Sequence, residues 1–199
     1  MSTRTSHNSE ASLFYITFTC YQWLPLFEPS SGYDLVYKWF DFLKEKYKIK
    51  TTAYTPDSYR DQIMFIALLV PFFSGLFFPT DQFDLSKVVG NGKRFIAYEI
   101  ITRLKALNDN KVLMQLQEGL SAKQIEKGQH HRVFEKSFDA KPVYHRGFLL
   151  QKLQYIHQNR VRGKWKLVEH WEDYNHSSAR FYVKNKTNGF VLVNYDELS

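Results

Sequence analysis

A run of sixteen residues without a charge, 63–78, most constrains how this chain can fold. It contains only apolar residues apart from Ser74, and Pro71 and the Ser74-Gly75 pair interrupt it. A membrane-spanning helix needs about 20 apolar residues, so a membrane segment is the minority alternative. We predict instead a buried strand, or two short strands with a turn near residues 71–75.

The flanking segments alternate between the strand period and the helical period. Strands are predicted at 13–20, 49–54, 132–138 and 180–184, and helices at 33–47, 85–107 and 147–159, with a short helix or excursion over 108–129. The glycines at 90 and 92 indicate close packing or a bend within the long helix. This order predicts an α+β, ferredoxin-like antiparallel sheet with helices packed on one face and a basic C-terminal extension.

Length and composition favour one domain. With 199 residues, 44% of them hydrophobic, the chain can bury a substantial core. We divide it into a polar tail at 1–12, a domain at 13–185 and a C-terminal tail at 186–199. Cys20 is the single cysteine, so no intrachain disulfide can form, and residues 1–12 lack the apolar core of a signal peptide. We therefore expect a cytoplasmic protein.

The segment 147–159 places three polar side chains on one helical face. Leu149, Leu153 and Ile156 recur at the helical period and predict a buried stripe. At about 100° per residue, the side chains of Lys152, Tyr155 and Asn159 then point away from that stripe together. The simpler interpretation is an amphipathic helix whose polar residues are merely solvated.

Positive charge is concentrated around this helix. Residues 141–168 contain no Asp or Glu, and their cations are Lys141, Arg146, Lys152, Arg160, Arg162, Lys164 and Lys166. Aromatic residues such as Tyr144 and Trp165 lie among them, a pattern suited to phosphate neutralisation and base stacking. A solvated basic face is the alternative. In the long helix, Lys93 and Arg94 are expected either to contact phosphate or to lie on a solvated face, and the sequence favours neither role.

A family resemblance is carried by the segments 14–19, 23–27, 33–40, 88–99, 151–159 (QKLQYIHQN), 162–165 (RGKW) and 173–182 (DYNHSSARFY). Together these segments, which cover roughly residues 13–50 and 78–185, resemble the REP-associated tyrosine transposases within the single-tyrosine HUH transposase superfamily. The resemblance implies a ferredoxin-like fold that acts on single-stranded or hairpin DNA in bacteria. The expected location is the nucleoid, and monomer and homodimer both stay open.

The resemblance also implies roles for residues of the 147–159 helix. Tyr155 is the expected nucleophile, which attacks a DNA phosphate to form a 5′-phosphotyrosine and a free 3′-OH. Asn159 is the expected ligand of a Mg²⁺ or Mn²⁺ ion that polarises the phosphate. The DNA-binding candidates are Lys93, Arg94, Arg146, Lys152, Arg160, Arg162, Lys164, Trp165 and Lys166.

The histidine pair of such a metal site is missing from this sequence. The superfamily carries His-x-His on a central strand, but no histidine occurs between Ser9 and His130. His157 points about 200° away from Tyr155 on the helix and is expected to be a packed or surface residue. The aspartates at 57, 61, 81 and 84 are expected to lie in turns or to cap helices rather than to bind a metal. We therefore expect impaired cleavage, and a DNA-binding protein without catalysis stays an alternative.

Overall fold

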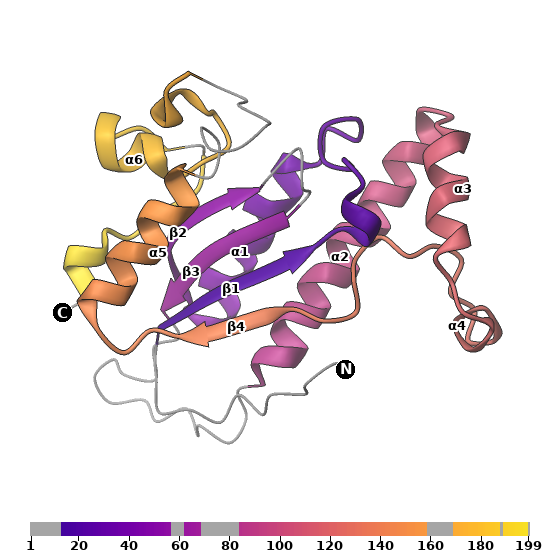
Figure 1. Ribbon diagram of the computed structural model, residues 1–199, viewed down its shortest axis with the longest axis horizontal. Helices are drawn as coiled ribbons and strands as arrows, with labels where there is room; N and C mark the ends of the chain where they lie inside the picture. Colours follow the sequence, from indigo (N-terminus) through magenta and orange to yellow (C-terminus); the bar gives the residue numbers. More distant parts are fainter. Residues whose placement is uncertain (1–12, 57–61, 69–83, 159–168, 188, 199) are drawn as a thin grey trace.

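Four strands form one antiparallel sheet. The computed structural model describes residues 13–56, 62–68, 84–158, 169–187 and 189–198. The sheet order is β2-β3-β1-β4 (Figure 1), with β1 at Leu13–Thr19, β2 at Lys50–Pro56, β3 at Gln62–Leu68 and β4 at Asp139–Pro142. The strands predicted at 13–20 and 49–54 are confirmed. Residues 63–68 of the uncharged run form most of β3, and the remainder of that run, 69–78, lies outside the described residues.

Helices cover both faces of this sheet, whereas the sequence indicated one face. Helices α1 (Tyr33–Tyr47) and α2 (Leu85–Ala106) share a core with Phe14, Ile16 and Phe18 of β1. Helix α5 (Arg146–Gln158) packs on the opposite face, against Leu13 and Tyr15 (Figure 1). The reason is that β1 has large apolar or aromatic side chains on both of its faces, and each face must be shielded from water.

Helices α1 and α2 lie close together at a glycine. A Cβ atom added to Gly92 of α2 would lie 2.2 Å from the buried ring of Trp39 on α1. Close packing is therefore the reason for Gly92. At its N-terminus, α2 is capped by Asp84, whose carboxylate accepts a hydrogen bond from the Lys87 N–H at 3.1 Å. The prediction that Asp84 caps a helix is therefore confirmed, while the aspartates at 57, 61 and 81 lie outside the described residues.

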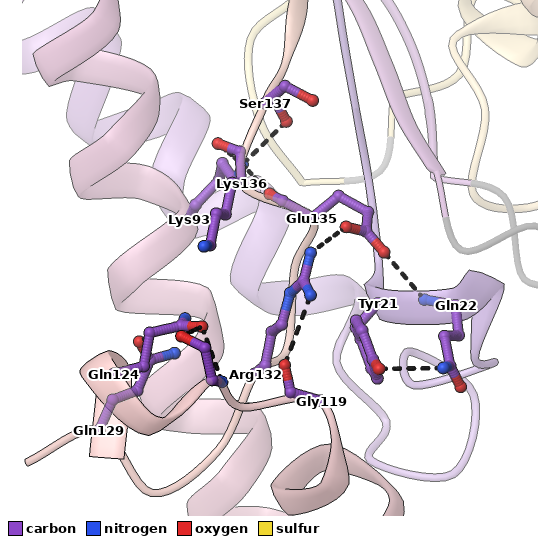
Figure 2. Close-up of polar contacts among 11 residues, drawn as sticks. Tyr21, Gln22, Lys93, Gly119, Gln124, Gln129, Arg132, Glu135, Lys136 and Ser137 are labelled. Carbon is purple, nitrogen blue, oxygen red and sulfur yellow. Dashed lines mark hydrogen bonds and ion pairs between the residues drawn. The ribbon is translucent and has the colours of Figure 1, made fainter. Parts of the chain in front are cut away.

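Two short helices, α3 (Asn110–Glu118) and α4 (Ala122–Glu126), follow α2 and lead back to the sheet. The strand predicted at 132–138 is wrong in its position. Within that range Phe134 makes an isolated bridge with Cys20, and the paired strand β4 begins only at Asp139. One reason is visible in Figure 2: the Lys93 ammonium of α2 donates hydrogen bonds to the backbone carbonyls of residues 135–137, which holds this stretch against the helix.

The C-terminal region wraps around one edge of the sheet. The strand predicted at 180–184 is wrong, because α6 occupies Ala179–Lys184. The Ser178 carbonyl accepts a hydrogen bond from the Phe181 N–H, and Asn185 ends the helix in the left-handed conformation. Short 3-10 helices lie at Tyr21–Trp23, Trp171–Asp173 and Tyr195–Leu198. Among the described helices, none combines the length and hydropathy that a bilayer crossing requires.

Candidate nucleic-acid interface

Tyr155 lies on the outer face of α5. Its side chain is 43% exposed, while Leu149, Leu153 and Ile156 are buried against the sheet. The predicted apolar stripe is therefore confirmed, and the phenol is directed away from it. Asn159, the residue one turn further on, lies outside the described residues, as do Arg160, Arg162, Lys164, Trp165 and Lys166.

Three aromatic rings surround the ammonium of Lys152, one turn before Tyr155. The Lys152 Nζ atom lies 4.9 Å from the ring centre of Tyr15, 5.2 Å from that of Phe148 and 5.7 Å from that of Tyr155. A cation within about 6 Å of a ring face is attracted by the ring quadrupole. The arrangement therefore holds a positive charge next to the exposed phenol of Tyr155.

Strand β1 supplies the base of this cluster through Tyr15. Tyr15 is 5% exposed and pairs in register with Lys141 of β4. Burial raises the pKa of the Tyr15 phenol, and the neighbouring Tyr155 and Asp139 raise it further. Asp139 in turn lies 3.4 Å from the Lys141 ammonium. Sequence reasoning missed Tyr15 and Asp139, because their approach to Tyr155 depends on the pairing of β1 with β4 and on the packing of α5 against β1.

His157 is a packed residue and faces away from the phenol. It is 5% exposed, its Nε2 lies 2.9 Å from the Ser178 hydroxyl oxygen, and its ring stacks on Trp171 with centroids 5.5 Å apart. Burial lowers the pKa of the imidazole to about 4. Of the two expectations for this residue, packed or on the surface, the structure confirms the first. His157 therefore joins α5 to the C-terminal region.

The described residues do not provide a metal site at Tyr155. No group of three His, Cys, Asp or Glu residues lies close enough to hold an ion in the described ranges. Met64 of β3 is buried beneath α5 and pairs with Thr17 of β1. A thioether is a poor ligand for Mg²⁺ or Mn²⁺, which prefer oxygen donors. Asp139 is a carboxylate near the cluster, but it is paired with Lys141.

The remaining cationic candidates lie in different surroundings. Lys93 is half-buried and donates hydrogen bonds to the carbonyls of Glu135 at 2.6 Å and Ser137 at 3.1 Å. Burial lowers its pKa to about 8. Arg146 pairs with Asp196 at 2.8 Å, and Arg94 is exposed on α2. A contact of these three residues with DNA stays a prediction.

A comparison with solved structures finds a protein of similar fold. A solved structure of a REP-associated tyrosine transposase bound to a REP hairpin is similar, with a TM-score of 0.55. The likeness is one of fold. The two sequences are 13% identical over 89% of this chain and 82% of that chain. No protein-family model matches the sequence, and no curated protein does. The comparison supports the predicted α+β architecture with a four-stranded antiparallel sheet and its relation to the transposase fold.

Proposed function

We propose that this chain is a transposase-like protein that binds single-stranded or hairpin DNA across the outer face of α5. The observation that carries the proposal is the exposed Tyr155 beside the ammonium of Lys152, which also lies over the rings of Tyr15 and Phe148. A lysine beside aromatic rings suits a phosphate and an unpaired base. The similar transposase structure is bound to a REP hairpin, which supports DNA as the partner.

The finer description of the fold is part of the same proposal. We infer a ferredoxin-like domain, because the order β1-α1-β2-β3-α2-β4 and the sheet order β2-β3-β1-β4 fit that topology once α3 and α4 are treated as an insertion. A DNA partner also implies a protein of the nucleoid, in the cytoplasm. The ratio of protein to hairpin in the complex, measured by sedimentation, would distinguish a monomer from a homodimer.

Strand cleavage is the part of the transposase activity that we propose is impaired. In a tyrosine transposase reaction on this chain, the Tyr155 oxygen would form a bond to phosphorus while the P–O3′ bond breaks. The 3′ oxygen would then take up a proton, leaving a 5′-phosphotyrosine. Met64 of β3 is buried beneath α5, and the sequence has no His-x-His. The described residues around Tyr155 therefore do not fit the divalent ion of that reaction.

A single oligonucleotide experiment tests both parts of this proposal. Labelled hairpin DNA is incubated with the protein in Mn²⁺ or EDTA, and free, bound and covalently attached DNA are separated on native and denaturing gels. We expect hairpin binding in both solutions, equal binding by Tyr155→Phe, and no covalent adduct. Tyr144→Phe is the matched control, because Tyr144 is also exposed and lies outside α5.

Two results would contradict the proposal in different ways. A metal-dependent adduct that is formed by wild type and Tyr144→Phe, but not by Tyr155→Phe, would show that cleavage is intact. Absence of hairpin binding by the wild-type protein would reject the DNA-binding function itself.

A further inference from the structure

A pocket lies at the opposite end of the molecule from α5. Its volume is about 560 Å³, and it is lined by residues of the C-terminal end of α2, of α3 and of the segment that follows α4. Figure 1 shows α3 and α4 at the end of the molecule away from α5. Pockets that bind small molecules usually measure about 300–1,000 Å³. The pocket is therefore large enough for a ligand of nucleotide size, and it is separate from the Tyr155 cluster.

Basic groups converge in this pocket. Lys105 enters from α2, and His130 and His131 enter from the segment after α4. Burial lowers the pKa of His131, and the nearby Lys105 and His130 lower it further. The described residues that line the pocket include no carboxylate. The Lys105 ammonium therefore has no carboxylate among these lining residues to balance it, and a bound anion would supply one, to which imidazole N–H groups can also donate.

The segment that carries the two histidines is held by hydrogen bonds to its backbone. The Arg132 N–H donates to the Leu116 carbonyl at 2.8 Å, and the Gln129 N–H donates to the Gln124 carbonyl at 3.0 Å. The Gln129 amide also donates to the His131 carbonyl at 2.9 Å. Figure 2 shows the side chains of Gln124 and Gln129 next to each other. The Gln117 side-chain amide lies 3.5 Å from the His131 Nε2 atom, so the segment and the His131 ring both have contacts before any ligand binds.

Helix α3 gives the pocket an apolar wall. Leu113 is 8% exposed, and Met114 at the rim is 60% exposed. A flat aromatic ring can pack against leucine, and the polarizable thioether of methionine makes favourable contacts with such rings. The pocket thus combines an apolar wall for a planar group with basic groups for an anion.

We propose that this pocket binds a nucleotide unit, with its phosphate against Lys105 and the two histidines and its base against Leu113 and Met114. This inference rests on the proposed function in one respect. If the chain binds DNA at α5, the nucleotide in this pocket belongs to a second segment of that DNA. A free nucleotide offers the same chemistry.

Methionine-methyl NMR tests the pocket directly, because the chain has only three methionines, at positions 1, 64 and 114. The full-length protein, labelled with ¹³C-methyl methionine, is titrated with deoxyadenosine monophosphate and separately with an unstructured single-stranded oligonucleotide. We expect a saturable shift of the Met114 methyl through the ring current of the base. The buried Met64 methyl should not move.

Matched lysine variants test the role of charge. Lys105→Gln should weaken the binding seen at Met114 about tenfold, whereas Lys111→Gln should leave it unchanged, because Lys111 is exposed on α3 outside the pocket. Deoxyribose 5-phosphate, which lacks a base, should compete with the nucleotide without causing the ring-current shift.

The outcomes show whether the site exists and, if it does, whether its ligand is DNA or a free nucleotide. A Met114 shift at lower oligonucleotide than nucleotide concentration indicates DNA, and a shift with the nucleotide alone indicates a free nucleotide. No shift with either probe, or a shift that Lys105→Gln does not weaken, would overturn the inference. Hairpin binding measured on the same sample shows independently whether the α5 proposal holds.

Discussion

His157 illustrates at the scale of one residue how burial changes the acid–base chemistry of a histidine. Two positions after Tyr155, it lies between α5 and the C-terminal region, stacked on Trp171 and hydrogen-bonded to Ser178. Burial lowers its pKa to about 4, so the neutral form is the one that the folded protein retains. Its contribution to stability must therefore depend on pH.

We predict that stability falls as the solution becomes acidic. The unfolded chain binds a proton at a pKa near 6.5 and the folded chain only near 4, so unfolding takes up a proton between these values. This histidine alone should lower the free energy of unfolding by about 2 kcal/mol between pH 7.5 and pH 5. Urea unfolding of the wild type and His157→Gln at both pH values measures the difference. An equal pH dependence in both proteins would contradict the assignment.

Lys152 is the residue that we expect to couple the aromatic cluster to DNA. Replacing it with Gln removes the charge that lies over Tyr15, Phe148 and Tyr155. Hairpin affinity should fall about fivefold, and the slope of log K against log salt should decrease by about 1. Fluorescence anisotropy at several salt concentrations measures both. Lys44→Gln is the control, because Lys44 is exposed on α1, which packs on the other face of the sheet. An unchanged salt slope in Lys152→Gln would show that this lysine does not meet a phosphate.

Helix α2 shows at the scale of an element that two glycines of similar sequence context can have different roles. The sequence indicated close packing or a bend for Gly90 and Gly92 alike. In the structure, a Cβ at Gly92 would overlap the ring of Trp39, whereas a Cβ at Gly90 would meet nothing within 4 Å. Contact with α1, which the sequence does not display, separates the two positions.

Alanine substitutions at these glycines should have opposite effects on stability. Gly92→Ala should lower the free energy of unfolding by about 1–3 kcal/mol, because the buried Trp39 ring has little room to move. Gly90→Ala should raise it by about 0.5–1 kcal/mol through the better helix propensity of alanine. Urea denaturation of both variants measures the difference. Equal effects of the two substitutions would show that the contact between α1 and α2 is looser than described.

At the scale of the whole molecule, the C-terminal residues close the core that the first strand begins. Phe190 and Leu192 are 4% and 7% exposed, and the Val193 N–H donates to the Thr51 carbonyl of β2 at 3.1 Å. The ring of Phe190 lies 5.0 Å from that of Tyr54 on β2 and 5.4 Å from that of Phe40 on α1. The two ends of the described chain therefore contribute to a single core.

Truncation of the Phe190 side chain should therefore destabilise the entire fold. We expect Phe190→Ala to lower the free energy of unfolding by about 3–5 kcal/mol and to reduce the melting temperature. The neighbouring Val191→Ala is the control and should change it by less than about 0.5 kcal/mol, because Val191 is 57% exposed. Thermal unfolding followed by circular dichroism measures both. A Phe190→Ala protein that melts at the wild-type temperature would mean that the C-terminal segment is not part of the cooperative core.

The sequence by itself determined the parts of this protein that depend on nearby residues. The helical spacing of apolar residues predicted α1, α2 and the buried stripe of α5, and it placed Tyr155 on the outer face of α5. This was possible because apolar residues on one face of a helix recur every three or four positions. The aromatic and β-branched content of residues 13–20 likewise predicted β1.

Only the tertiary structure decided which distant residues meet. The packing of α5 against β1 brings Tyr15 beneath Lys152 and Tyr155, and the path of the chain after α4 brings Lys93 to the carbonyls of residues 135–137. Residues 180–184, which have the composition of a strand, instead form α6, which contacts β2 through the Tyr182 hydroxyl and the Thr52 carbonyl. Local composition sets a preference of about 1 kcal/mol at most, and contacts between residues far apart in the chain can override it.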